Sequence, residues 1–309
     1  NKFEKEDKNL LYLFSLIMFL LPSFRSGAIW ANSQITGLIF FLLSLFFFTK
    51  WIKKKDFNNI NLDLFLQIVF MSLAVYTRQL YAIVFLYFVF LYYKKLKFKT
   101  FFLLTAIIFL FALPGIFLVL NFPIILSVTF DNRFYNSILV DSSIMSFYLI
   151  PIYFSLFFDK KINLNLKDKK RIIASFFSLI VVLILSQYFN YNFRLGGGFF
   201  LKLSVIVFDN FYLFFLSSFI GLFLLLLLSF EDKDNFLLIL LLLFAFTGFY
   251  IAQKYFEPMF LLILFLVFET KISYKFFSNF KHTYFYYCYI LIYFISAVIN
   301  DIFKITKNI

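Results

Sequence analysis

The 309-residue chain has very few residues that form disulfides or bind transition metals. It contains one cysteine, Cys288, and one histidine, His282. A single cysteine excludes an intrachain disulfide and a cysteine-based metal site. His282 stands beside Lys281, and we expect it to be a solvated loop residue rather than a catalytic group.

Motifs of familiar enzyme classes are also missing. The chain has no P-loop, no dinucleotide-binding fingerprint, no metal-ligand spacing and no nucleophile motif. We therefore identify no cofactor in the sequence, and no pattern of residues specifies a divalent metal.

Apolar residues, in contrast, are abundant. They make up 63% of the chain, which includes 55 Phe and has a mean hydropathy of +0.92. A soluble domain has about 45–50% apolar residues. The apolar runs are continuous rather than alternating, which indicates membrane-spanning helices. The sequence therefore predicts an all-α, polytopic transmembrane bundle.

We predict about eleven membrane segments in a single integral-membrane domain, 1–309. Runs of about 20 apolar residues cross a bilayer, and 62–93 is expected to form either a helical hairpin or one helix broken at Arg78-Gln79. The chain starts at Asn1 without an initiator Met, so we expect upstream spans to be missing. The predicted segments are 10–22, 28–49, 62–77, 80–93, 101–120, 138–158, 172–190, 209–230, 236–252, 257–269 and 285–300.

Lysine-rich loops predict the orientation of these segments. With the N-terminus inside, alternation places 21 of the 29 Lys and Arg residues in inner segments and six in outer ones. Cytoplasmic loops carry such an excess of basic residues. The net charge of +13 is thereby explained by topology and anionic headgroups, and we expect no nucleic-acid partner.

Four of the five arginines fall on the predicted outer side, together with other polar groups. Ionisable groups near membrane depth are costly, which favours a functional cavity over chance; side chains that snorkel or pair structurally are the alternative. The candidate binding residues are Arg25, Asn32, Gln34, Arg78, Gln79, Arg133, Arg194, Gln253, Lys254 and Glu257.

This composition of the outer set suits a lipid-linked phosphate. The arginine fork binds phosphate in a bidentate manner and keeps its charge. A nearby carboxylate can act as a general base toward a sugar hydroxyl. Asp131 and Asp141 are the candidates, and Asp131 is the better placed; a structural ion pair with Arg133 is the alternative for Asp131.

Two groups of small residues have structural and functional interpretations. Gly196-Gly197-Gly198 follows Arg194 and forms either a flexible turn or a place where backbone N–H groups approach a phosphate. The spacing of Ser33 and Gly37 favours close helix packing.

Three stretches carry a resemblance to a known family. Pro22–Gly37 (PSFRSGAIWANSQITG), followed by an apolar run and lysines, resembles a luminal junction of membrane glycosyltransferases with the GT-C fold. Ala74–Tyr81 (AVYTRQLY) resembles the Arg-Gln element of the group related to dolichyl-phosphate-glucose α-1,2-glucosyltransferase. Gln253–Pro258 (QKYFEP) is similar to a late outer junction of bacterial members.

The resemblance implies sugar transfer on the outer face of a membrane, with bacterial inner membrane and periplasmic face expected. The partners would be a polyprenyl-phosphate-linked sugar and a glycan or protein acceptor, among membrane lipids. Arg25, Arg78 and Gln79 would bind the donor phosphate. The family places a catalytic acidic motif in its first outer loop, whereas segment 23–27 contains no acid.

Two other functions stay open. A transporter or flippase of lipid-linked oligosaccharide predicts pseudo-symmetric halves with broken helices, and no clear internal repeat is present. A polymerase or ligase of such oligosaccharides would also use outer arginines but needs a larger outer loop than 121–137 or 191–208.

The orientation can be checked by cysteine accessibility. We predict that cysteines introduced near positions 130 and 195 react with a membrane-impermeant thiol reagent added outside, and that those near 55 and 165 do not. The opposite labelling pattern would overturn the assignment of the arginine-containing face to the outside.

Overall fold

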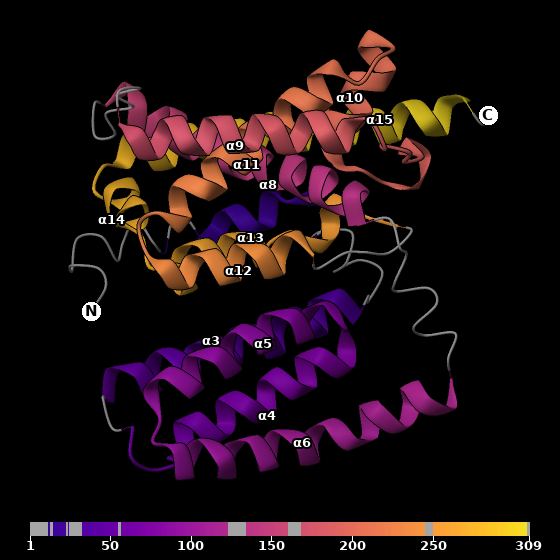
Figure 1. Cartoon of the computed structure of the whole chain (residues 1–309). Helices are drawn as coiled ribbons and strands as arrows, with labels where there is room; N and C mark the ends of the chain where they lie inside the picture. The colour runs from indigo at the N-terminus through magenta and orange to yellow at the C-terminus, as the bar shows by residue number, and fades with distance from the viewer. Residues whose placement is uncertain are drawn as a thin grey trace. The chain divides into compact units, whose positions relative to one another are not determined.

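The computed structural model describes residues 12, 15–22, 24, 33–54, 57–122, 134–159, 168–244 and 250–307. Over these ranges the chain is all-helical and has no strand (Figure 1). Contacts group the chain into two compact units, which are treated separately below. The large unit comprises 1–26, 138–236 and 250–309, and the small unit comprises 27–137 and 237–249.

Helix boundaries coincide with local capping signals. Asn61 accepts a hydrogen bond from the Leu64 N–H, and Asp168 accepts one from the Lys170 N–H; such side chains satisfy N–H groups that a helix start leaves unpaired. The small unit holds α3 (Ser33–Lys54), α4 (Leu62–Thr77), α5 (Leu80–Lys95) and α6 (Phe98–Asn121). The large unit holds η1 (Leu16–Leu20), α8 (Phe134–Phe158), α9 (Lys169–Ser186), η2 (Phe193–Leu195), α10 (Gly198–Phe208), α11 (Tyr212–Ser229), the start of α12 (Lys233–Leu243), η3 (Gln253–Tyr255), α13 (Met259–Leu262), the π-helical η4 (Ile263–Val267), α14 (Lys271–Phe277) and α15 (Phe280–Lys307).

Helices α4 and α5 form an antiparallel hairpin, which decides between the two interpretations of 62–93. Arg78 between them is extended, with φ −151° and ψ 116°. Gln67, early in α4, accepts a hydrogen bond from Tyr92, late in α5, and donates one to Ser44 of α3 at 3.3 Å. This buried contact holds the three helices together.

The two ends of the small unit differ in their basic residues. At one end Lys54 pairs with Asp63, and Lys95 Nζ lies 5.6 Å from the centre of the Phe57 ring. At the other end Gly37 packs against the turn that carries Arg78. Because a helix rises about 1.5 Å per residue, these ends are about 25 Å apart along α3. The lysines and Arg78 therefore lie at opposite ends, as alternation of the segments predicts.

Helix α11 packs against α9 and against α8 in the large unit (Figure 1). Small residues allow α8 and α11 to approach closely: Ser143 and Ser217 share a hydrogen bond of 2.6 Å, and the Ser218 hydroxyl donates to the Leu139 carbonyl at 2.8 Å. A Cβ atom at Gly221 would overlap the Ser142 carbonyl oxygen. Small and hydroxylated residues promote such contacts between membrane helices.

Five helices of the described residues are long and apolar enough to cross a membrane: α3, α6, α8, α11 and Phe280–Ile299 of α15. These helices identify an integral-membrane protein, while the total of eleven segments stays a prediction. The segment 191–208, expected as a loop, contains the apolar helix α10. The expected segment 257–269 consists of the short α13 and η4.

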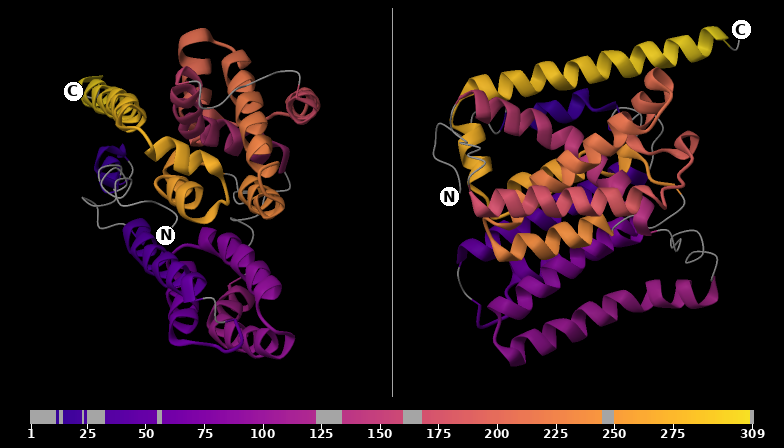
Figure 2. Two further views of the ribbon diagram at one scale, coloured as in Figure 1. Left: turned by 90° about the vertical axis from the view of Figure 1, so that its left-hand side faces the viewer. Right: turned by 45° about the horizontal axis from the view of Figure 1, so that its top comes forward.

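Helix α15 is the longest helix of the described residues and extends well past its neighbours (Figure 2). Tyr284 and Ile292 are more than 60% exposed on it. Apolar side chains on the outside of a helix of this length suit contact with lipid rather than water.

The close contact of α8 with α11 should make Gly221 intolerant of a side chain. We predict that Gly221→Ala lowers stability by about 1–3 kcal/mol because the added methyl group overlaps the facing backbone. Thermal unfolding in detergent measures this change. Gly115→Ala in α6 is the matched control, since its Cβ would lie 3.5 Å from Tyr76, an ordinary contact. Equal unfolding temperatures for the two variants would contradict the packing.

Candidate functional site

The predicted site residues fall into three sets. Arg25, Asn32, Asp131 and Arg133 lie outside the described residues. Gln34, Arg78 and Gln79 belong to the small unit, whereas Arg194, Gln253, Lys254 and Glu257 belong to the large one. Each of the two described groups is considered within its own unit.

In the small unit, Gly37 brings the start of α3 against the Arg78 turn. A Cβ atom at Gly37 would lie 2.8 Å from Thr77 Oγ1, 3.0 Å from Tyr81 and 3.5 Å from Arg78 Cγ. The predicted packing role is thus confirmed for Gly37, whereas Ser33 is exposed. Gln34 precedes Gly37 by one helical turn, so Gln34 and Arg78 lie on neighbouring elements at the same end of the unit.

The backbone of the turn holds Arg78 in place. Its N–H donates to the Ala74 carbonyl at 2.9 Å, closing α4, and its carbonyl accepts from the Tyr81 N–H at 3.1 Å, opening α5. Arg78 is partly buried and Gln79 is exposed. An arginine at the junction of two helices therefore stands on a fixed backbone with its side chain partly open to the surroundings.

In the large unit, Glu257 is the centre of a buried hydrogen-bond network. Its Oε1 accepts hydrogen bonds from the Tyr148 hydroxyl at 2.6 Å, the Tyr293 hydroxyl at 3.2 Å and Gln253 Nε2 at 3.4 Å. The side chain is only 7% exposed. A buried carboxylate needs such donors, and these come from α8, α15 and η3.

Gln253 links this network to α10. Its Oε1 accepts from the Phe199 N–H at 2.7 Å, and its Nε2 donates to the Tyr148 hydroxyl at 3.2 Å. The Phe199 N–H belongs to the first turn of α10, where N–H groups lack partners within the helix. Gln253 and Glu257 therefore hold the surrounding helices in place.

The two cations of this region have a different setting. Arg194 and Lys254 are exposed. Lys254 Nζ lies 5.7 Å from the Tyr250 ring centre and 5.6 Å from that of Tyr255, within range of a cation–π attraction. Neither cation belongs to the buried network around Glu257.

The three glycines before α10 serve close packing. Gly197 adopts φ +85° and its N–H donates to the Ile251 carbonyl at 2.7 Å. A Cβ atom at Gly196, with φ +151°, would overlap that carbonyl oxygen. The Gly197 N–H thus binds the protein's own backbone, which favours the turn interpretation over phosphate binding.

The side chain of Tyr191 links the segment before α10 to the segment that contains Ile251. Its hydroxyl accepts a hydrogen bond from the Ile251 N–H at 2.8 Å and donates one to the Ile251 carbonyl at 3.3 Å. Burial raises the pKa of the Tyr191 phenol to about 12, the hydrogen bond with the Ile251 backbone opposes this rise, and the nearby Asp141 carboxylate adds to it. Tyr191 therefore stays a neutral hydroxyl at physiological pH.

Of the two candidate bases, Asp141 is the one whose surroundings are described. It lies inside α8 with no exposed surface. Neither carboxylate oxygen has a hydrogen-bond partner among the described residues. Polar groups buried in this way are rare because they lose their hydration without compensation.

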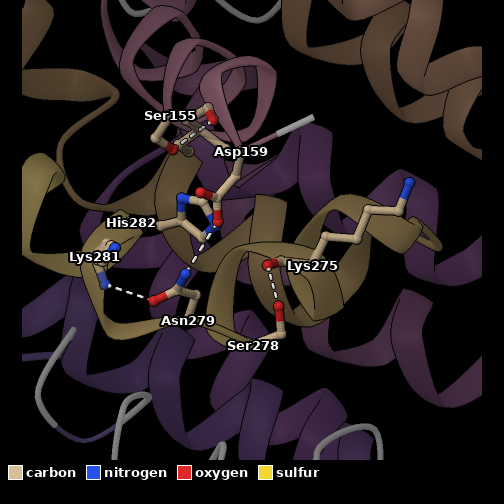
Figure 3. A network of polar contacts seen from close by, with 8 residues as sticks. Ser155, Asp159, Lys275, Ser278, Asn279, Lys281 and His282 are labelled. Carbon is tan, nitrogen blue, oxygen red and sulfur yellow. Dashed lines mark hydrogen bonds and ion pairs between the residues drawn. The ribbon is translucent and has the colours of Figure 1, made fainter. Parts of the chain in front are cut away.

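His282 is not the solvated loop residue that the sequence suggests. It lies in the first turn of α15, is only 2% exposed, and its Nε2 is 3.1 Å from Asp159 Oδ2 at the end of α8 (Figure 3). Asn279 donates to the same oxygen at 3.0 Å and accepts from the Lys281 N–H. Asn279 at a capping position is a sequence signal for a helix start here. No sequence signal identifies Asp159, 123 residues earlier, as the partner of His282.

Within the ranges described, no three His, Cys, Asp or Glu side chains gather in a way that could hold a metal ion. Comparison of the chain with protein-family models, with curated proteins and with solved structures finds no match. The chemistry of the residues themselves is therefore the basis for a functional proposal.

The Glu257 network can be tested through Tyr148. We predict that Tyr148→Phe destabilises the protein by about 1–3 kcal/mol, because the buried carboxylate loses its shortest hydrogen bond. Thermal unfolding of the purified protein measures the change, and Tyr188→Phe at an exposed position is the control. A double-mutant cycle with Glu257→Met, which removes the acceptor oxygen, should show coupling of about 0.5–3 kcal/mol. Strictly additive effects would rule out the contact.

Proposed function

We propose that this protein is a membrane glycosyltransferase that moves a sugar from a polyprenyl-phosphate donor to a lipid-linked or protein acceptor. We further propose that it acts on the extracytoplasmic face of a bacterial inner membrane. The five apolar helices support an integral-membrane enzyme, and a polyprenyl donor is confined to the membrane in the same way.

The position of Arg78 is the observation that carries this proposal. Arg78 stands at the break between α4 and α5, beside Gly37 of α3 and about 25 Å from the lysine-rich end of α3. A lipid-linked phosphate lies where hydrocarbon meets headgroup, which is the depth expected for a turn between two membrane helices. The planar guanidinium suits phosphate better than a lysine ammonium does.

The proposed reaction explains why a fixed positive charge is needed. The acceptor oxygen bonds to the anomeric carbon while the bond from that carbon to the phosphate oxygen breaks. Negative charge then grows on the departing polyprenyl phosphate. Arg78 would stabilise that charge. A hydrogen-bond donor that is already in position where the charge develops lowers the activation barrier most. By sequence, Arg25 and Gln79 would contribute to the same subsite.

Transport of a lipid-linked oligosaccharide is the second candidate. Asp141 favours it, because ionisable groups inside membrane helices often belong to proton or ion pathways. Reconstituted protein distinguishes the two functions. A transferase forms a new glycosidic bond in detergent, whereas a flippase only moves the intact lipid-linked oligosaccharide between leaflets of a vesicle.

The role of Arg78 is tested by Arg78→Lys, which keeps the charge but loses the fork. We predict that transfer from a polyprenyl-phosphate sugar falls on the order of 10²-fold, while insertion and unfolding temperature are preserved. Arg171→Lys, the same change in a predicted inner segment, should leave transfer unaffected. Unchanged turnover in Arg78→Lys would remove the proposed role.

A further inference from the structure

Asp141 is a carboxylate for which the described structure supplies no counter-charge and no donor. It is the eighth residue of α8, has no exposed surface, and neither oxygen has a hydrogen-bond partner among the described residues. An ionised carboxylate without a partner in such surroundings costs several kcal/mol. A carboxyl group persists there only if something neutralises it.

The face of α8 on which Asp141 lies shows where a neutralising group would come from. Residues three and seven positions apart share a helix face, which places Asp141 with Ile144 and Tyr148. Ile144 packs against Gly198, and Tyr148 binds Glu257. The serines that contact α11 lie on the other side of α8. Asp141 therefore points toward the segments around 191–198 and 251–257, not into the α8–α11 contact.

None of the charged or titratable groups of those segments is a cation paired with Asp141. Tyr191 lies within electrostatic reach of Asp141, but its hydroxyl is bonded to the Ile251 backbone. The two positive charges there, on Arg194 and Lys254, belong to exposed side chains. Among the described residues, the other titratable groups near this side of α8 are Tyr148 of the same helix, Tyr250 and Tyr255 near Tyr191, Glu257 after η3 and Tyr293 of α15.

We propose that Asp141 is a proton-binding site, at which the carboxyl group takes up and releases one proton through the segments that contain Tyr191 and Ile251. A proton needs a single oxygen atom. A metal ion needs several oxygen ligands, and the described residues show no cluster of acidic side chains or histidines here. This site does not depend on glycosyl transfer, since it rests on the burial of Asp141 and on the lack of hydrogen-bond partners among the described residues.

Tyr191 regulates access in this arrangement. Its hydroxyl bridges the N–H and carbonyl groups of Ile251, so it ties the segment before η2 to the segment before η3. Both segments lie on the side toward which Asp141 points. Exchange of the proton therefore requires this bridge to open.

Infrared spectroscopy of the protein in liposomes tests the site directly. A protonated carboxylic acid has a carbonyl stretch well separated from that of an ionised carboxylate. The difference between wild type and Asp141→Asn at neutral pH should show this band, and transfer into D₂O should shift it to lower frequency. Asp63→Asn is the control, because Asp63 is paired with Lys54 and should show no such band.

The infrared band and the thermal stability of Asp141→Asn together test whether Asp141 is protonated. The proposal predicts that Asp141→Asn unfolds at the wild-type temperature or above, since a neutral amide replaces a neutral acid. A missing band, or a clear loss of thermal stability, would show that Asp141 is an ionised, paired residue and would overturn the proposal. A band that does not shift in D₂O would overturn it too, because the proton would then be trapped.

Tyr191→Phe tests the route of exchange. The proposal predicts that removing the bridge to Ile251 speeds the D₂O shift of the Asp141 band several-fold without abolishing it. Tyr188→Phe, at an exposed position close in sequence, should leave the rate unchanged. Equal rates in wild type and Tyr191→Phe would exclude this route.

Discussion

The close approach of α8 to α11 is the contact on which the rest of the large unit depends. It needs small side chains at several levels, with Ser143 meeting Ser217 and Gly221 meeting the Ser142 backbone. Other polar groups of α8 and of the residue that follows it make contacts toward both ends of the unit. Tyr148 binds Glu257, and Asp159 binds His282 near the other end. A shift of α8 would disturb both networks together.

The small unit is organised by a polar contact instead. Gln67 joins Ser44 and Tyr92 in its interior, and so fixes the register of three helices whose apolar surfaces alone would permit sliding. That register sets Gly37 beside Arg78 at one end and Lys54 beside Asp63 at the other. In coiled coils a single buried polar residue selects one register among several of similar hydrophobicity, and Gln67 is placed to act in the same way.

Local features of the chain were predictable from its sequence, and distant pairings were not. Continuous apolar runs correctly indicated helices, and Gly37 correctly indicated a site of close packing. The interruption at Arg78-Gln79 marked the hairpin turn. In contrast, His282 looked solvated because its neighbours are polar, yet Asp159 reaches it across 123 residues. Glu257 likewise accepts a hydrogen bond from Tyr148, which lies 109 residues earlier in the chain. Periodicity reports which face of a helix is apolar but contains no information on which distant helix covers it. The site residues Arg25, Asn32, Asp131 and Arg133 stay predictions.

The origin of the donors around Glu257 has a consequence for biogenesis. Tyr148 is synthesised long before Glu257, but Tyr293 follows it by 36 residues. When the Glu257 segment first enters the membrane, its carboxylate therefore lacks one of its hydrogen-bond donors until α15 arrives. The arrival of α15 completes the network, so the last helix of the described chain also supplies the last hydrogen-bond donor of this buried acid.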